Sequence, residues 1–389
     1  MNIRRYDQEY LPCPDEGVQA VGIEPTHGTL RTGIFEPVTN QVRIFVGRLV
    51  SILLALLIGL LVSSAASCVT VVNVNPGDDL DAKANAAPAG ATIQVHGKAD
   101  VATYFYAVNN PITLKDGQTL VGDTGTTKHF GPATVPNPVV GIKKARRVSM
   151  TTLVKTDGNH IDISWLDVNA TGAGKGITTH YGGPEIHMDH LRVYGAKGPG
   201  IGQAQGVLTD SELFGNGKNA STIGHTAAGI KCIVACEVAT TYAHDNGGNG
   251  LWCDVGCAPV PERRNGVWFH DNVTKGNSRF GIRYENSPKP DLNPNDPVTA
   301  LIEGNVSYGN GEGGVAVADA ANATVRSNVF GRRPDGTMVH NGRKLAVILR
   351  NSGEADRGTQ KNATVIDNTL NREGITDRNL RGNVCTNNY

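Results

Sequence analysis

The chain has 389 residues, with 36 basic and 36 acidic side chains. This even balance gives no support for a nucleic acid or an anionic membrane surface as a partner. Glycine is frequent, at 48 residues, while aromatic residues make up only 5%. Such a composition is typical of short strands joined by tight turns, and it argues against a helical bundle.

Near the N-terminus, residues 49–62 form a 14-residue apolar run that follows two arginines and precedes a group of small residues. This is the arrangement of a secretory signal, and the run is shorter than the roughly 20 residues that cross a bilayer. We therefore predict an export segment over residues 43–67 and a secreted or cell-envelope protein. A membrane anchor and a lipid anchor at Cys68 are the alternatives. Residues 1–42 show no hydrophobic period, and we interpret them as disordered or as a wrongly assigned extension.

The chain after this segment opens with a strand pattern at residues 69–74, followed by a short helix over 78–87 with an acidic first turn. Residues 91–95 predict the next strand, and residues 111–122 alternate around an Asp-Gly turn. An opening of strand, short helix and a Leu-Lys-Asp-Gly-Gln-Thr-Leu-Val-Gly segment resembles the N-terminal cap and first coils of right-handed parallel β-helix proteins, the pectin-lyase-like superfamily.

A glycine followed by an aliphatic residue then recurs at steps of 24, 29, 21, 31 and 33 residues. A motif that returns at such a period indicates stacked repeats, each too small to bury its own apolar face. The glycines are Gly176, Gly200, Gly229, Gly250, Gly281 and Gly314. Alternating segments at 161–168, 186–193 and 267–273, among others, predict strands. Together with these repeats, the resemblance implies one all-β domain, a right-handed parallel β-helix over residues 69–385 with a short N-terminal capping helix.

Asparagines occupy matching places in four of the alternating segments, at Asn272, Asn305, Asn328 and Asn368. Identical amides stacked at a turn can hydrogen-bond along the solenoid, as they do in cross-β ladders. We therefore predict a structural asparagine ladder at one turn of the coil and assign these residues no chemistry.

Four of the seven cysteines also follow the repeat, because Cys232 and Cys253 lie three residues after their glycines and Cys236 and Cys257 lie seven after. Neighbouring coils are about 4.8 Å apart, within the range of a disulfide. We predict at least one of the pairs Cys232–Cys253 and Cys236–Cys257, with buried thiols as the alternative. An extended segment from Cys253 to Cys257 would span about 13 Å, which argues against a bridge between them.

Strand alternation sends the second and fourth residues after each glycine outward. In the central coils these are Lys231, Trp252, Asp254, Arg283 and Glu285. Asp254 and Glu285 would stack on adjacent strands about 5 Å apart, the separation of a retaining glycosidase pair, and serve as acid, base or nucleophile. Trp252 would offer a face to a sugar ring, and Lys231 and Arg283 would neutralise an acidic group on the substrate.

Two observations limit this interpretation. The same charges would also form plain surface ion pairs. The sequence also lacks the Asn-Thr-Asp triplet of polygalacturonases and the Asp-Pro-His-Asp motif of mannuronan epimerases. It is more similar to exported β-helix proteins with a Trp-x-Asp coil followed by a Tyr-Glu coil.

Insertions at 256–265 and 286–297 follow the two carboxylates, and we expect them to form the walls of a groove.

From these features we predict an exported, monomeric, carbohydrate-active protein, a hydrolase or lyase of a cell-wall or acidic polysaccharide. The alternative is a non-catalytic, adhesin-like envelope module that binds a cell-surface glycan. No cofactor is predicted, because the sequence shows no dense cluster of carboxylate ligands. Calcium bound by the acidic pair is kept as a candidate.

Overall fold

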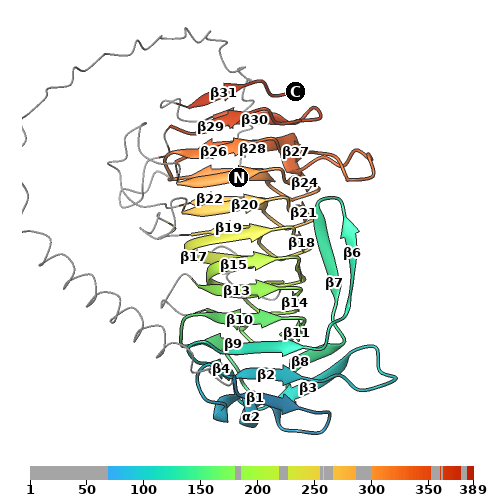
Figure 1. The fold of residues 1–389 in the computed structure, drawn as a ribbon. Helices are drawn as coiled ribbons and strands as arrows, with labels where there is room; N and C mark the ends of the chain where they lie inside the picture. Colours follow the sequence, from blue (N-terminus) through green and yellow to red (C-terminus); the bar gives the residue numbers. More distant parts are fainter. Residues whose placement is uncertain are drawn as a thin grey trace, which may run out of the picture. The chain divides into compact units, whose positions relative to one another are not determined.

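The computed structural model describes residues 69–179, 185–218, 227–254, 257, 266–285, 299–351, 360, 362–377 and 383–389. The predicted extension, the predicted export segment and Cys68 lie outside these residues. The described chain folds as a right-handed parallel β-helix, as the resemblance implies (Figure 1). No helix in the described part of the chain has the length and apolar composition needed to cross a bilayer.

Each coil contributes to three faces. The first and second faces belong to one 20-stranded sheet and the third face is a nine-stranded sheet, both parallel throughout. The strands of the first face are β4 (Ile112–Leu114), β9 (Thr152–Thr156), β12 (Lys175–Thr178), β15 (Ile201–Thr209), β17 (Ala228–Ala239), β19 (Asn249–Cys253), β22 (Phe280–Glu285), β25 (Gly313–Ala318), β28 (Leu345–Arg350) and β30 (Gly374–Asp377).

Strands β15 and β17 are long enough to turn the corner and also belong to the second face. The other strands of the second face are β1 (Val71–Val74), β2 (Thr92–Val95), β5 (Thr119–Gly122), β10 (Ile161–Ser164), β13 (Ile186–Asp189), β20 (Val267–His270), β23 (Ala300–Glu303), β26 (Ala323–Arg326), β29 (Thr364–Ile366) and β31 (Val384–Thr386). The third face holds β3 (Tyr104–Val108), β8 (Val140–Lys144), β11 (Asp167–Asn169), β14 (Arg192–Tyr194), β16 (Glu212–Phe214), β18 (Tyr242–His244), β21 (Val273–Lys275), β24 (Val306–Tyr308) and β27 (Val329–Phe330). A short 3₁₀ helix, η1 (Gly342–Lys344), precedes β28.

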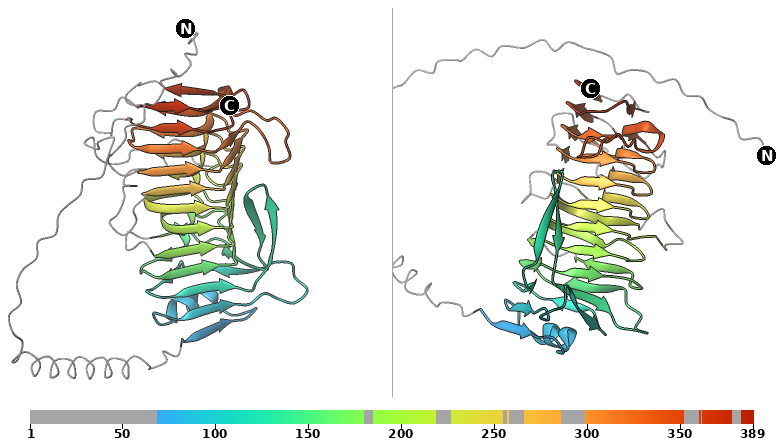
Figure 2. Two further views of the ribbon diagram at one scale, coloured as in Figure 1. Left: turned by 45° about the horizontal axis from the view of Figure 1, so that its top comes forward. Right: turned by 90° about the vertical axis from the view of Figure 1, so that its right-hand side faces the viewer.

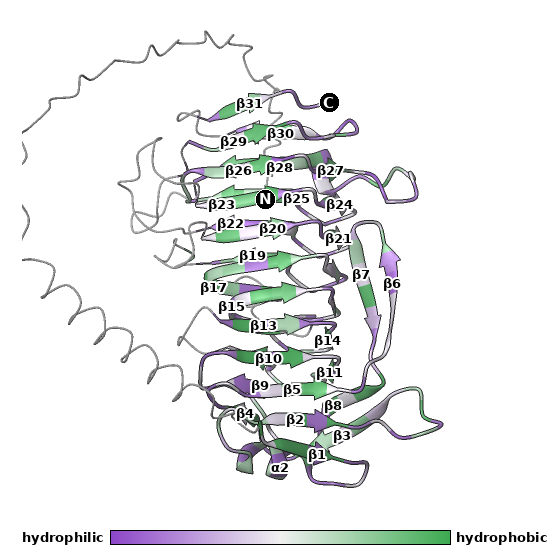
Figure 3. Ribbon diagram, in the orientation of Figure 1, coloured by the Kyte–Doolittle hydropathy of each residue, from purple (hydrophilic) through white to green (hydrophobic). Residues whose placement is uncertain are grey.

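The repeated aliphatic residues form one inward-facing column of the core. Ile177, Ile201, Ile230, Leu251 and Ile282 are register partners on successive strands of the first face, and all are buried. Stacking of like residues in this way buries a continuous apolar interior that no single coil could form. Apolar residues are accordingly concentrated in the stacked strands (Figure 3).

Several segments that alternate without a break in the sequence are two strands in the structure. Residues 161–168 hold all of β10 and the start of β11, separated by a bend at Trp165 with φ of 55°. His190 and Asp271 make the same left-handed bend in later coils, with φ of 49° and 53°. Alternation continues across a one-residue bend, so the pattern alone does not show where the second face ends and the third begins.

The predicted asparagine ladder lies at this corner between the second and third faces. The Asn272 amide donates to Asn305 at 3.0 Å, Asn305 to Asn328 at 2.9 Å and Asn328 to Asn368 at 2.9 Å. The ladder continues one coil further to Asn388. Each buried amide is therefore satisfied by its neighbour in the next coil.

A second ladder, which was not predicted, lies at the corner between the third and first faces. Its donor–acceptor steps are between 2.8 and 3.1 Å, and it runs through Asn216, Asn246, Asn277, Asn310 and Asn341 to Glu373. This ladder lies against four of the six repeated glycines, Gly200, Gly229, Gly250 and Gly281. A Cβ atom at Gly250 would lie 2.8 Å from the Asn277 amide nitrogen and 2.6 Å from the Gly281 carbonyl oxygen, so a larger residue would displace the ladder or the neighbouring coil.

The N-terminal end of the core is covered by helix α2 (Leu80–Ala86), close to the predicted range. The Asp79 carboxylate caps it by accepting from the Ala82 amide at 3.0 Å, and Leu80 and Ala84 are buried. An antiparallel hairpin, β6 (Thr126–Phe130) and β7 (Ala133–Asn137), was not predicted and lies along the third face (Figures 1 and 2).

Candidate functional site

The structure brings the five predicted site residues together on the outer side of the first face. Lys231 on β17, Trp252 on β19 and Arg283 on β22 are register partners. Asp254 and Glu285 lie two residues further along, again at matching positions because Cys253 pairs with Tyr284. The predicted insertions lie outside the described residues, apart from Cys257.

Trp252 lies between two cations. The Lys231 Nζ atom is 4.0 Å from the centre of the Trp252 ring, and the Arg283 guanidinium carbon is 5.6 Å from it. Only 2% of Trp252 is exposed. The register partners on the two neighbouring strands lie against the indole ring and cover it. A contact between Trp252 and substrate stays a prediction.

Glu285 is the most constrained member of the site. It is 3% exposed, its Oε1 accepts from the Trp252 indole nitrogen at 2.9 Å, and its Oε2 pairs with Arg283. Burial raises the pKa of the Glu285 carboxyl; Arg283 and the indole donor oppose the rise, and the Asp254 carboxylate adds to it. The carboxyl is therefore held more easily in its protonated form than an exposed glutamate.

Lys231 and Asp254 form a second ion pair, with 2.6 Å between Nζ and Oδ2. Their side chains are 16% and 17% exposed, so this pair is the part of the site that solvent reaches most readily. The two ion pairs lie on the same side of the sheet, and Asp254 acts electrostatically on Glu285.

Arg283 is 8% exposed, and burial lowers its pKa, which the Glu285 carboxylate opposes and Arg279 and Arg350 reinforce. A guanidinium nevertheless stays charged in a protein. Among the described residues no hydrogen-bond partner exists for its Nε. This donor is buried, so its lack of a partner is an unsatisfied polar group inside the site.

Two further cations near the site were not predicted from the sequence. Arg279 pairs with Glu312 at 3.0 Å, and Arg350 lies 5.5 Å from the centre of the Phe280 ring. Arg350 occupies the position of Glu285 two coils further on, through Ala318. Arg350 could have been predicted from the sequence by extending the column of outward-facing residues one coil beyond Ala318. The first face therefore carries more positive charge around the site than the five residues alone suggest.

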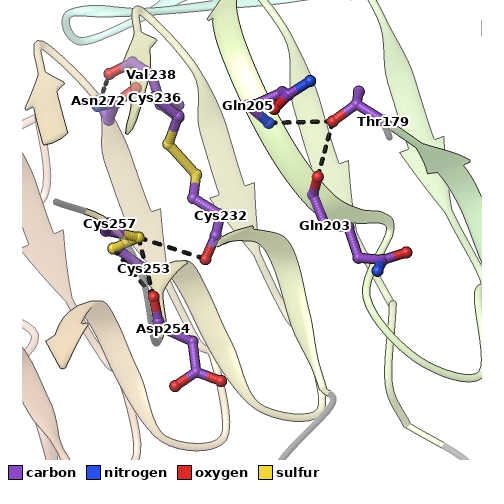
Figure 4. Close-up of a disulfide and its surroundings, with 10 residues drawn as sticks. All are labelled: Thr179, Gln203, Gln205, Cys232, Cys236, Val238, Cys253, Asp254, Cys257 and Asn272. Atoms are coloured by element: carbon purple, nitrogen blue, oxygen red, sulfur yellow. Dashed lines mark hydrogen bonds between the residues drawn. A yellow bond between two sulfur atoms is a disulfide. The ribbon is translucent and has the colours of Figure 1, made fainter. Parts of the chain in front are cut away.

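Both predicted disulfide pairs were wrong. The structure forms Cys232–Cys236 and Cys253–Cys257, with Cα atoms 6.4 and 6.3 Å apart (Figure 4). Each pair spans the corner between the first and second faces, where the backbone turns instead of extending, so a separation of four residues suffices. Disulfides of this kind belong to an oxidising compartment.

The second face holds a cluster of similar composition, here called the second-face cluster: Trp268, His270, Glu303 and Arg326. The Trp268 indole nitrogen donates to Glu303 at 2.9 Å, and Arg326 pairs with Glu303 at 2.6 Å. His270 stacks on Trp268 with ring centres 3.9 Å apart. The side chains of Glu303 and Arg326 are 20% and 49% exposed, so this cluster is far more open than the first-face site.

The third face carries a row of alternating charges. Arg192 contacts Asp167 at 3.1 Å and Glu212 at 2.7 Å, and Glu212 contacts His244 at 3.1 Å. Burial raises the pKa of Asp167 to about 6, against the effect of Arg192. One residue per coil supplies this row, so a pattern sought within single strands does not show it. In the described residues no group of three or more His, Cys, Asp or Glu side chains is arranged to hold a metal ion.

Comparison with known proteins gives similarity to solved β-helix structures. No protein-family model matches the sequence, and no curated protein sequence matches it. The A-module of mannuronan C-5 epimerase AlgE4 from Azotobacter vinelandii is 16% identical, with a TM-score of 0.47 over 80% of this chain and 96% of that one.

Two other solved structures are similar to the same degree. An alginate lyase from a Paenibacillus species is 14% identical, with a TM-score of 0.43 over 82% of this chain and 99% of that one. The Dettilon tailspike protein is 14% identical, with a TM-score of 0.44 over 77% of this chain, which spans 59% of the tailspike. At these identities and TM-scores the similarity says nothing of the chemistry of this chain.

Proposed function

We propose that the first-face site binds and cleaves an acidic polysaccharide outside the cell. The observation that carries this proposal is the buried Glu285 carboxyl with its raised pKa, beside a second carboxylate, Asp254, on the adjacent coil. Two carboxyl groups held in unlike environments are the usual acid and base of glycoside chemistry. The disulfides and the predicted export segment support a location outside the cytoplasm.

The roles follow from the environment of each group. Glu285, more readily protonated, is the general acid that donates its proton to the leaving glycosidic oxygen. Asp254, more exposed and paired with Lys231, is the nucleophile or base. To the Arg283 guanidinium and the Lys231 ammonium we assign the binding of a carboxylate or sulfate group of the substrate.

Two reactions fit these roles and differ in what Asp254 does. In hydrolysis Asp254 attacks the anomeric carbon, or activates a water that does, while Glu285 protonates the departing oxygen. In β-elimination Asp254 removes the proton next to the uronate carboxylate, whose developing negative charge Arg283 stabilises. Both cleave the same glycosidic linkage but break different bonds: hydrolysis breaks the bond between the anomeric carbon and the bridging oxygen, and elimination breaks the bond between that oxygen and the uronate ring carbon on its other side. Only elimination leaves an unsaturated sugar.

A specific observation favours a second candidate function, non-catalytic glycan binding. Each carboxylate is already paired with a cation, and Trp252 is buried. A site with internally satisfied charges can recognise an acidic glycan by exchanging these pairs for contacts with the ligand, without chemistry. Binding in this mode would depend on Lys231 and Arg283 and little on the protonation of Glu285.

The test is a screen of acidic and neutral polysaccharides with the domain from residue 69, recording new reducing ends together with the ultraviolet absorbance of unsaturated products. Reducing ends alone indicate hydrolysis, and both signals indicate elimination. Asp254→Asn and Glu285→Gln should each lower turnover roughly 10²-fold or more. Glu303→Gln, which changes the equivalent glutamate of the second-face cluster, is the matched control and should leave turnover unchanged. Binding without turnover would favour the recognition module.

A further inference from the structure

Two disulfides occupy the same corner of the solenoid in two neighbouring coils. Cys232–Cys236 spans the corner within β17, and Cys253–Cys257 spans it after β19 (Figure 4). Cys232 and Cys253 are register partners, so the two bridges begin at equivalent positions. Each bridge joins residues only four apart in the sequence.

Among the described residues, an earlier corner of this kind carries hydrogen bonds and no disulfide. The Thr179 hydroxyl donates to the backbone carbonyl oxygen of Gln203 at 2.8 Å and accepts from the backbone N–H of Gln205 at 3.1 Å (Figure 4). Across the described chain, covalent bridges appear only in the two coils that carry Lys231 and Asp254. The corner therefore does not need a disulfide as such, and the position of the two bridges calls for a separate reason.

The bridges are built directly into the backbone of the first-face site. Lys231 immediately precedes Cys232, and Asp254 follows Cys253 inside the short loop that Cys257 closes. The Asp254 amide donates to the Cys232 carbonyl oxygen at 3.0 Å, and the Cys257 Sγ atom lies 3.1 Å from the Asp254 carbonyl oxygen. Asp254 is thus tied to both coils through groups next to the bridges.

The two disulfides are better suited to fixing the local backbone than to raising the overall stability of the protein. A bridge that closes so short a loop restricts the unfolded chain least, so its contribution to overall stability is at the low end for disulfides. All four cysteines are at most 4% exposed, which keeps them from reductants in the folded protein. They are therefore permanent constraints on the corner.

We propose that the two corner disulfides are positioning residues, which hold the Lys231–Asp254 ion pair against Trp252 and keep the Asp254 carboxylate beside Glu285. The use of this placement in glycan chemistry rests on the proposed function. The placement itself is a physical property of the folded chain and can be measured without any glycan.

The test uses two double variants, Cys232→Ala with Cys236→Ala and Cys253→Ala with Cys257→Ala. The first readout is hydrogen exchange of the Asp254 amide, which the corner protects. Exchange should become roughly tenfold faster or more when the second bridge is lost, because local opening no longer has to strain a closed loop. Thr179→Ala, which removes the hydrogen-bonded corner of an earlier coil, is the matched control and should leave Asp254 unchanged.

The second readout is the pKa of Glu285, followed by carboxyl-carbon NMR. It should fall in the bridge variants because the repelling Asp254 carboxylate moves away, and a bridge that acted only on stability would not shift it. If neither the exchange nor this pKa changes, the proposal is overturned. If both change while no polysaccharide is bound or cleaved by the parent protein, the positioning inference stands and the proposed function fails. A Cys253→Val, Cys257→Val variant, which fills more of the buried space, replaces the alanine pair if that pair does not fold.

Discussion

The first-face site and the second-face cluster are built from the same parts. In each, a tryptophan indole donates a hydrogen bond of 2.9 Å to a glutamate in the next coil. An arginine forms an ion pair with that glutamate. They differ in burial, since the side chains of Arg283 and Glu285 are 9% and 4% exposed and those of Arg326 and Glu303 are 49% and 20% exposed. Residue type and register therefore determine which side chains come together, while burial determines how strongly each charge is stabilised by its partner.

The largest difference is expected when the arginine is removed. Arg283→Met leaves Glu285 buried without its cation and should lower the free energy of unfolding by about 3–5 kcal/mol. Arg326→Met breaks a largely exposed pair and should cost about 0–1 kcal/mol. Urea unfolding of the two variants measures both, and equal losses would show that burial does not separate the two clusters.

The next difference concerns the indole donor. Trp252→Phe removes the hydrogen bond to the buried Glu285 carboxylate and should cost about 1–3 kcal/mol beyond the loss seen for Trp268→Phe, because a buried acceptor is left unsatisfied. The pKa of Glu285 should rise further in Trp252→Phe, since the indole donor favours the charged form. Thermal unfolding and carboxyl-carbon NMR check the two effects, and an unchanged pKa would contradict the assigned hydrogen bond.

A smaller effect is expected from pH. The pKa of Glu285 is raised in the folded state, so its contribution to stability is complete below the unfolded pKa and is lost as the pH rises through the folded pKa. A folded-state pKa that lies one pH unit above the unfolded value is equivalent to about 1.4 kcal/mol of stability. Glu285→Gln should flatten this part of the stability-against-pH curve, whereas Glu303→Gln should leave it in place. If the slope of the stability-against-pH curve is unchanged in Glu285→Gln, it arises from another group, such as Asp167.

The smallest effect is expected at the exposed edge of the site. Lys231→Met removes the partner of Asp254 and one cation against Trp252, and it should cost about 1 kcal/mol. Lys155→Met is the matched control, because Lys155 lies on the same outward column and also pairs with an aspartate. The side chains of the Lys155–Asp157 pair are 40% and 48% exposed, so this pair is far more open to solvent. Its loss should be close to zero, and the weakening of acidic-glycan binding should be confined to Lys231→Met.

Features that repeat from coil to coil could be predicted from the sequence. The aliphatic column beginning at Ile177 and the Asn272 ladder recur from coil to coil, because each coil needs a buried apolar residue at the one position and a hydrogen-bond partner at the other. The second ladder, through Asn277, recurs as regularly and was overlooked, although the glycine period was its indirect sign.

Features that do not recur in every coil could not be predicted in this way. The pairing of Cys253 with Cys257 rests on a turn that brings two Cα atoms to 6.3 Å, whereas an extended segment would hold them apart. The hairpin β6–β7 reaches the third face through a hydrogen bond from the Thr134 amide to the Thr240 carbonyl oxygen at 2.8 Å, a contact between segments about a hundred residues apart that no local pattern encodes.

Alternation and repeat length are local and cumulative properties of the sequence. They were enough to predict stacked coils of strands, the register that puts Lys231, Trp252 and Arg283 in one row, and the placement of Asp254 beside Glu285, and the family resemblance added the right-handed parallel β-helix. The burial of Trp252 and Glu285, the easier protonation of Glu285 and the closing of the corner by the disulfides became apparent only in the folded chain. Burial and desolvation depend on every neighbour packed around a group, and those neighbours are set by how the coils stack and turn.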